Sequence, residues 1–258
     1  MADGLPSPEM TKMRISGNIL ITGANRGIGL ALTKALADRP EVDRIYATCR
    51  NPETSKELLT IERLCPKIKI LKCDVQNDLN LQLTVNQLEC DIPNEGLDML
   101  INNAGAFEPI GSSFDTPNRS CYWRHFDVNA VSAVVITKLF TPFLRKCHRD
   151  HPIVLNLTAL AGSSSITQTS SIRSEDNIVY GMSKAALNHF TAAYASMVQN
   201  CGIVTFGISP PWTATRLGGP SATSTPTEAA DAILRTVEGL TAADTGCCFD
   251  SQGNKLPF

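Results

Sequence analysis

Short apolar runs alternate with amphipathic stretches along most of the chain. Runs such as Asn18–Thr22, Lys67–Cys73 and Pro152–Thr158 are continuous rather than alternating, which is typical of strands covered on both faces. Gly27–Arg39 and Tyr180–Val198 carry the apolar spacing of helices. This alternation predicts an α/β fold: a single doubly wound Rossmann-type domain with a mostly parallel seven-stranded sheet between helices.

The other elements follow from the same patterns. The remaining predicted strands are Arg44–Cys49, Leu97–Ile101, Ile203–Ile208 and Cys247–Asp250, and the remaining predicted helices are Pro52–Cys65, Leu79–Glu89, Ala130–Arg145 and Thr227–Glu238. Residues 1–16 are predicted to be a flexible leader, and residues 17–258 the domain. The polar stretches Ser163–Asn177 and Leu217–Pro226 are predicted loops, either walls of a substrate site or plain surface loops.

Composition narrows the classes of partner. The 258 residues carry a formal net charge of -2, which argues against a nucleic-acid or anionic-membrane surface and favours a small-molecule ligand. Nine cysteines without CxxC spacing, and no recognisable secretory signal, indicate reduced thiols and a cytoplasmic location. The four histidines lack zinc-ligand spacing, so no metal site is predicted.

A glycine-rich segment joins the first predicted strand to the first helix. In TGANRGIG, Gly23 suits a sharp turn, Gly27 allows close approach of a pyrophosphate, and Gly29 allows close packing of helix and strand. The anion would then lie at a helix N-terminus. Ordinary βα turns also contain glycines, but the strand–turn–helix context favours dinucleotide binding.

The end of the second strand should meet the adenosine ribose. NAD sites usually place a carboxylate there, whereas this chain has Arg50. Arg50, with Arg26 in the glycine loop, is suited to a 2′-phosphate; the alternative is two solvated surface arginines. The missing acid favours NADP(H) as the cofactor.

Two further strand ends carry candidate contacts. Asp74 follows the third strand and is placed either to accept from the adenine amino group or to form a turn, with Val75 beside the ring. Asn103, Ala104 and Gly105 follow the fourth strand, where small residues allow the cofactor to approach and Asn103 is placed to tie strands together.

Tyr180 and Lys184 are four residues apart in a predicted helix and therefore share one face. A phenol is a poor acid at neutral pH, but a nearby ammonium stabilises the phenolate and lowers the pKa. Tyr180 would then protonate a carbonyl oxygen as hydride reaches the carbon. Because this pair is common by chance, it gains weight only from the motifs around it.

The motifs TGANRGIG, CRNP, CDV, NNAG, FDVNA and YGMSK occur in the order found in short-chain dehydrogenases/reductases, and the chain resembles the carbonyl-reductase-like branch with C-factor and sniffer-type proteins. The resemblance implies that Asn129 supports a proton-relay water with Lys184. It also implies that Pro210, Thr213 and Thr215, in PPWTAT, lie at the nicotinamide carboxamide, and that the chain forms a homodimer or homotetramer or stays monomeric. The residues assigned to the cofactor are Gly23, Asn25, Arg26, Gly27, Ile28, Gly29, Arg50, Asp74, Val75, Asn103, Ala104, Gly105, Tyr180, Lys184, Pro210, Thr213 and Thr215.

Two positions depart from the family pattern. Ala159, in NLTALAG, stands where the family has the serine that hydrogen-bonds the substrate carbonyl, and Pro211 replaces a glycine. Loss of such a donor typically costs about 10²–10³ in rate. Thr158 should point to the opposite face, whereas Ser163 or Ser164 could compensate if the loop curls inward.

Two functions are therefore carried forward. The first is an NADPH-dependent reductase of a small aldehyde or ketone, with Tyr180 as proton donor. The second is an NADP(H)-binding homologue with little or no catalysis, acting as a sensor or interaction protein, or a serine-to-alanine active-site variant.

Overall fold

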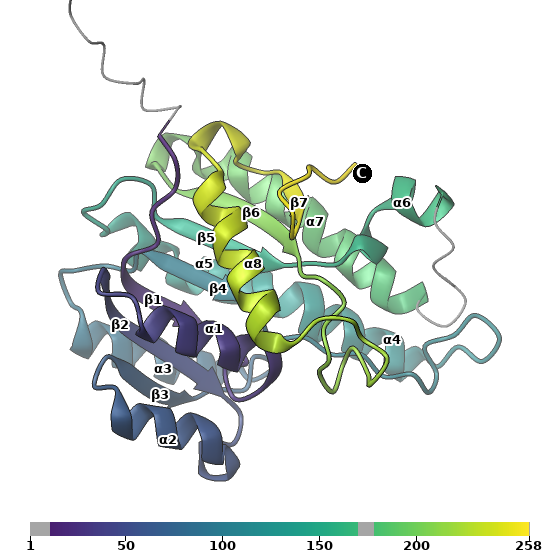
Figure 1. Cartoon of the computed structure of the whole chain (residues 1–258), viewed down its shortest axis with the longest axis horizontal. Helices are drawn as coiled ribbons and strands as arrows, with labels where there is room; N and C mark the ends of the chain where they lie inside the picture. The colour runs from purple at the N-terminus through teal and green to yellow at the C-terminus, as the bar shows by residue number, and fades with distance from the viewer. Residues whose placement is uncertain (1–10, 170–177, 258) are drawn as a thin grey trace, which may run out of the picture.

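Seven strands form one parallel sheet between two layers of helices in the computed structural model, which describes residues 11–169 and 178–257 (Figure 1). The strand order is β3-β2-β1-β4-β5-β6-β7, and every neighbouring pair is parallel. The strands are β1 (Gly17–Ile21), β2 (Val42–Cys49), β3 (Ile68–Lys72), β4 (Met99–Asn102), β5 (Ile153–Leu157), β6 (Val204–Ser209) and β7 (Cys248–Asp250). This confirms the predicted doubly wound α/β fold.

The helices cover both faces of this sheet. They are α1 (Gly27–Ala37), α2 (Lys56–Leu64), α3 (Asp78–Asp91), α4 (Arg119–Phe126), α5 (Ser132–Arg145), α6 (Ser164–Thr169), α7 (Ile178–Val198) and α8 (Pro226–Gly239). Helices α1, α2 and α8 bury their apolar sides on one face, and α3, α5 and α7 on the other. Successive strand residues serve opposite cores, as with Ile19 and Leu20 in β1, so continuous apolar strands are needed.

The chain changes direction of winding between β3 and β4, because β4 pairs with β1 rather than with β3. Loops that follow β1 and β4 therefore leave the sheet toward opposite faces, and a ligand crevice forms beyond these carboxyl ends in folds of this type. The candidate residues of the sequence gather at this edge.

The helix predicted to begin at Ala130 begins earlier. Helix α4 starts at Arg119, where the Asn118 side chain accepts a hydrogen bond from Cys121 N, and it continues through a π-helical turn, Asp127–Val131, into α5. Only Cys121 and His125 of α4 are buried, so its apolar periodicity is too sparse to be recognised in the sequence. By length and composition this helix would be able to cross a membrane, but 50% of its apolar window is buried within the fold, as in core helices.

Two predicted flexible segments are ordered in part. Ser164–Thr169 forms the short helix α6 inside the stretch predicted as a loop, whereas residues 170–177 lie outside the described residues. Met13 and Ile15, inside the predicted leader, are buried, and Met13 N donates to Leu240 O over 2.9 Å. The leader prediction is therefore too long, because two apolar side chains anchor this segment; residues 1–10 are not described.

Candidate active site

The glycine loop between β1 and α1 packs so closely against the loop after β4 that Gly29 leaves no room for a side chain. Gly23 has φ +67°, a conformation that favours glycine. A Cβ at Gly29 would lie 2.4 Å from both the Gly23 carbonyl oxygen and Asn103 Nδ2. The first turn of α1 contains no acidic residue, and Arg26 at its N-cap makes no side-chain capping bond. Backbone N–H groups of this turn are thus suited to an anionic ligand.

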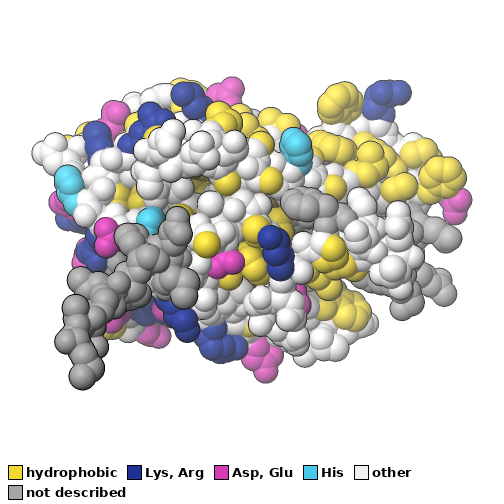
Figure 2. Space-filling model, turned by 90° about the horizontal axis from the view of Figure 1, so that it is seen from above, with side chains coloured by type: hydrophobic (Ala, Val, Ile, Leu, Met, Phe, Trp, Pro, Cys, Tyr) yellow, Lys and Arg dark blue, Asp and Glu magenta, His cyan; other side chains and the backbone are white. Residues whose placement is uncertain are grey.

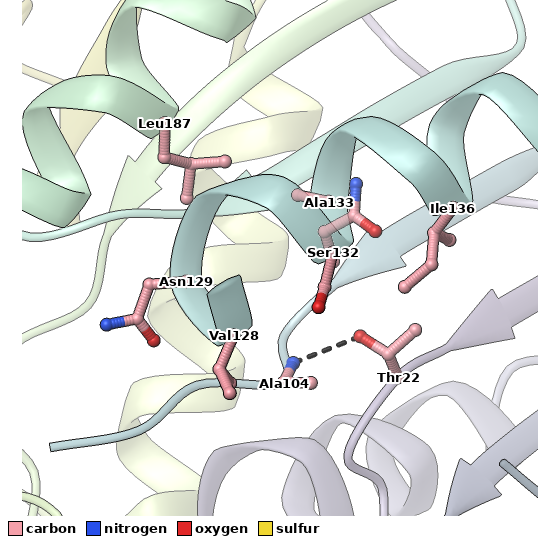
Figure 3. A pocket seen from close by; sticks show the side chains of 9 residues that line it. Thr22, Ala104, Val128, Asn129, Ser132, Ala133, Ile136 and Leu187 are labelled. Carbon is pink, nitrogen blue, oxygen red and sulfur yellow. Dashed lines mark hydrogen bonds between the residues drawn. The ribbon is translucent and has the colours of Figure 1, made fainter. Parts of the chain in front are cut away.

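Asn103 joins the ends of β1 and β4, as the sequence predicted. Its Nδ2 donates to the carbonyl oxygens of Thr22 at 2.7 Å and Gly23 at 3.1 Å. Thr22 Oγ1 in turn accepts from the backbone N–H groups of Asn103 and Ala104, both at 3.0 Å. Figure 3 shows the bond from Ala104. The two loops that would face the dinucleotide therefore form one cross-braced unit.

Arg26 in the glycine loop and Arg50 directly after β2 are exposed, and neither forms an ion pair with any carboxylate in the described part of the chain. Burial, followed by repulsion from Arg216 and from Arg50, lowers the pKa of the Arg26 guanidinium. Positive charges that lie close together without an acid fit a ligand with an additional phosphate. Arg216, on the segment after β6, was not predicted from the sequence, because only the fold brings it here.

Asp74 takes the turn role that the sequence left open. One of its carboxylate oxygens accepts from Gln76 N at 3.2 Å, and its own backbone N–H donates to Asn80 Oδ1 at 3.1 Å. Val75 packs partly against the core formed by α3, α5 and α7. These contacts hold the end of β3 in place, and the adenine contact stays a prediction.

Tyr180 and Lys184 share one face of α7, as their spacing predicted. Lys184 Nζ lies 5.8 Å from the centroid of the Tyr180 ring and donates to Leu157 O, at the end of β5, over 2.7 Å. The Phe107 ring packs edge-on against the Tyr180 ring, with 5.6 Å between centroids. The phenol of Tyr180 and the ammonium of Lys184 therefore lie close together at the carboxyl edge of the sheet, next to the Phe107 ring.

The pKa values of this pair correct one sequence expectation. Burial raises the pKa of Tyr180 to about 12 and lowers the pKa of Lys184 to about 8. Desolvation of the charged form causes both shifts, and the Lys184 ammonium is engaged by Leu157 O. Tyr180 is consequently protonated at neutral pH, the state that a proton donor requires.

Asn129 lies in the π-helical turn and connects this turn to the loop after β4 and to α7. Its Oδ1 accepts from Ala106 N at 2.8 Å, and its Nδ2 donates to Ala106 O at 3.0 Å and to Ser183 Oγ at 2.9 Å. Ser183 Oγ donates to Tyr180 O at 2.8 Å. Asn129 thus positions the catalytic helix through Ser183, which sequence reasoning missed because YGMSK does not show where the serine points. The relay of protons through water stays a prediction.

Behind this turn lies a cavity of about 10 Å³, lined among others by Thr22, Asn102, Asn129 and Ser132 (Figure 3). This volume is close to the minimum that accommodates one water molecule. The cavity is therefore too small for a substrate.

Ala159 follows β5 in extended conformation and is half-buried. Thr158 Oγ1 bonds Asn188 Oδ1 on α7, consistent with its predicted orientation away from Ala159. Ser163 does not compensate as proposed, because its Oγ donates to Pro257 O and accepts from Ile166 N at 3.2 Å, at the start of α6. Ser164 is exposed in the first turn of α6.

The segment after β6 lies across the glycine loop. A Cβ at Gly27 would be 3.1 Å from Thr215 Cγ2, so the two segments touch. Thr213 is buried, and its Oγ1 donates to Pro211 O at 2.6 Å. Pro210 is half-buried at the strand end. Among the described residues, no group of three or more His, Cys, Asp or Glu side chains is placed to hold a metal ion.

Comparison with known proteins agrees with this arrangement. The sequence model of the family described as short chain dehydrogenase matches residues 17–225. The short-chain dehydrogenase/reductase eupG of a Phoma species is 30% identical over 226 residues, covering 80% of both chains. The carbonyl reductase Sniffer of D. melanogaster superposes with a TM-score of 0.88 at 27% identity, over 95% of this chain and 100% of the other. The NADPH-bound carbonyl reductase from chicken fatty liver has a TM-score of 0.86 at 24% identity, over 93% and 98%. The chain belongs to the short-chain dehydrogenase family of oxidoreductases.

Proposed function

We propose that this protein reduces a small aldehyde or ketone with NADPH and that Tyr180 donates the proton. The observation that carries the proposal is the pairing of a protonated phenol and a buried ammonium on one face of α7, at the sheet edge where the glycine loop lies. The carbonyl reductase activity named for Sniffer, and the NADPH bound by the chicken protein, support the choice of reaction and cofactor.

In this proposal one set of residues binds the cofactor and another set transfers the proton. Arg26 and Arg50 would hold the 2′-phosphate, and the N-terminus of α1 the pyrophosphate. Bound NADPH supplies the hydride. Tyr180 gives its hydroxyl proton to the carbonyl oxygen, Lys184 stabilises the phenolate left behind, and Asn129 with Ser183 keeps the helix in place.

The aromatic surroundings support a substrate with an apolar substituent. Phe107 contacts Tyr180 directly, and Ile110, Phe114 and Trp123 are exposed on the segment before α4 and on α4. Figure 2 shows hydrophobic side chains gathered toward the end of the molecule that carries α4 and α6 in Figure 1. On the same face, charged side chains of both signs are spread over the remainder, which supports a small-molecule partner rather than nucleic acid or an anionic membrane.

Ala159 favours a second candidate, an NADP(H)-binding protein with weak catalysis that acts as a sensor or interaction partner. Without a hydroxyl at this position, Tyr180 alone donates to the oxygen. Since one lost donor costs about 10²–10³ in rate, the first candidate remains the better supported.

NADPH oxidation over a panel of aldehydes, ketones and diketones tests both candidates, with Tyr180→Phe as the inactive control. Turnover above that control by the natural protein supports the reductase. Turnover only by Ala159→Ser supports a weakened enzyme. If the unmutated protein and Ala159→Ser both bind NADPH tightly and neither shows turnover, the result contradicts the reductase and supports the second candidate, a cofactor-binding protein.

Location and assembly complete the proposal. All nine cysteines lie in the described residues and are unpaired, which supports a reducing, cytoplasmic environment. Val131 at the end of the π-helical turn, Val134 on α5 and Met197 on α7 are exposed apolar residues and support a homodimer or homotetramer through these helices. Light scattering coupled to size exclusion distinguishes these from a monomer.

A further inference from the structure

Three arginines from distant parts of the chain carry charges that interact, with Arg26 as the one that both others affect. Arg26 belongs to the glycine loop, Arg50 follows β2, and Arg216 lies in the segment between β6 and α8. All three side chains are exposed, and within residues 11–169 and 178–257 none is paired with a carboxylate. Their charges are close enough that, after burial, repulsion from Arg216 and then from Arg50 lowers the pKa of Arg26.

The backbone explains why Arg216 is held near the glycine loop. Its neighbour Thr215 packs against Gly27, with Cγ2 only 3.1 Å from the position of a Cβ there. A turn secures this contact, because Gly219 N donates to Thr215 O at 2.9 Å and Gly218 N to Thr215 Oγ1 at 3.1 Å. Arg216 is the residue inside this turn that follows the contact; it is exposed and near enough to Arg26 for the two charges to repel each other.

Grouping three guanidiniums without an acid costs free energy that an anion would recover. A phosphate monoester carries close to two negative charges and three acceptor oxygens, and guanidiniums bind such groups through paired hydrogen bonds. The pyrophosphate, by contrast, would be held by the backbone N–H groups at the N-terminus of α1. The cluster is therefore matched to the additional phosphate that distinguishes NADP(H) from NAD(H).

We propose that Arg216 is a third ligand of the 2′-phosphate of NADP(H), contributed from the β6–α8 segment to a site it shares with Arg26 and Arg50. This rests on the proposed function, since it needs NADP(H) as the cofactor. The proposal has a consequence for the segment Leu217–Pro226, which begins at the next residue. When Arg216 binds the 2′-phosphate, the first residues of this segment, a candidate wall of the substrate site, should become less mobile.

Calorimetric titration with NADPH and with NADH tests the assignment without measuring turnover. Arg216→Gln is expected to raise the Kd for NADPH about tenfold, the effect of one charge-assisted hydrogen-bond pair, and to change the Kd for NADH less than about twofold. Arg216→Lys keeps the charge but loses the planar fork, so an intermediate effect is expected. The matched control, Arg235→Gln, removes the same charge from an exposed position on α8 and should bind NADPH like the natural protein.

Each result has one interpretation. Equal losses for NADPH and NADH would place Arg216 at the shared pyrophosphate and overturn the proposal, as would an unchanged Kd for NADPH. If the natural protein bound neither dinucleotide, the proposed function itself would fail, and this assignment with it. Normal NADPH binding by the natural protein and by Arg216→Gln alike would defeat the assignment of Arg216 alone.

Limited proteolysis gives a second readout. Trypsin cleaves after arginine, so the Arg216–Leu217 bond reports directly on whether the guanidinium is engaged. NADPH should slow cleavage at this bond more than NADH does when both are at saturation. Equal cleavage rates with the two dinucleotides would contradict the proposal.

Discussion

The dinucleotide end and the catalytic end of the site are built on different principles. At the ends of β1 and β4, most of the stabilising contacts involve main-chain atoms. The side chains of Asn103 and Thr22 form hydrogen bonds to backbone groups, and there is no space for a side chain at Gly29. At the end of β5, function depends on single side chains, and one of them, Ala159, carries no donor. We therefore expect that mutations at the catalytic end change the reaction rate without changing cofactor affinity to the same extent.

The sharpest test of this separation is Tyr180→Phe. Removing the hydroxyl removes the only proton donor proposed at the catalytic end, so the rate of carbonyl reduction should fall about 10³-fold. The Kd for NADPH should change much less than the rate, because Tyr180 is one of many residues assigned to the cofactor and takes no part in the bracing of the glycine loop. Single-turnover rates and calorimetric titration measure the two quantities. A rate that falls less than tenfold would remove Tyr180 from the mechanism.

Ala159→Ser should change the catalytic end in the opposite direction. A hydroxyl in the half-buried position after β5 supplies the missing donor, and the reduction rate should rise about 10²-fold with NADPH affinity unchanged. Ala159→Val is the matched control, since it adds bulk without a donor and should give no gain. Similar rates in all three proteins would mean that this position does not face the substrate.

At the dinucleotide end, Gly29→Ala should damage binding and folding together. The new Cβ would meet Gly23 O and Asn103 Nδ2 at 2.4 Å, and such overpacking costs about 1–3 kcal/mol. The midpoint of thermal unfolding should fall, and the Kd for NADPH should rise. Gly239→Ala, where a Cβ meets nothing within 4 Å, provides the control. An unchanged midpoint in Gly29→Ala would show that the loop yields easily.

The pH dependence of reduction should report on Lys184. Its pKa is lowered by burial to about 8, so the ammonium is present below that pH and lost as the pH rises through it. Tyr180, with its pKa raised to about 12, stays protonated over the same range. The rate should therefore fall about tenfold between pH 8 and pH 9.5, because phenolate stabilisation disappears. A rate at saturating NADPH that stays level to pH 10 would contradict this role of the ammonium.

Much of the site could be predicted because strand ends and glycine loops are local signals. The turn at Gly23, the tie through Asn103 and the shared face of Tyr180 and Lys184 all follow from spacing within one or two elements. Local spacing could not show whether the Ser163 hydroxyl points into the site beside Tyr180. Its hydroxyl is engaged by Pro257, which is 94 residues away in sequence.

The sequence by itself determined the order of the strands and, apart from α4 and α6, of the helices, together with the edge at which the chemistry gathers and the absence of a hydroxyl at residue 159, since each depends on residue type and local period. Only the tertiary structure decided which charges meet and what burial does to them. The charge of Arg216 acts on Arg26 because Thr215 packs on Gly27, and the pKa values of Tyr180 and Lys184 move in opposite directions because burial disfavours the charged form of each. Electrostatic energies depend on distance and on exclusion of water, and neither is encoded at any single position of the chain.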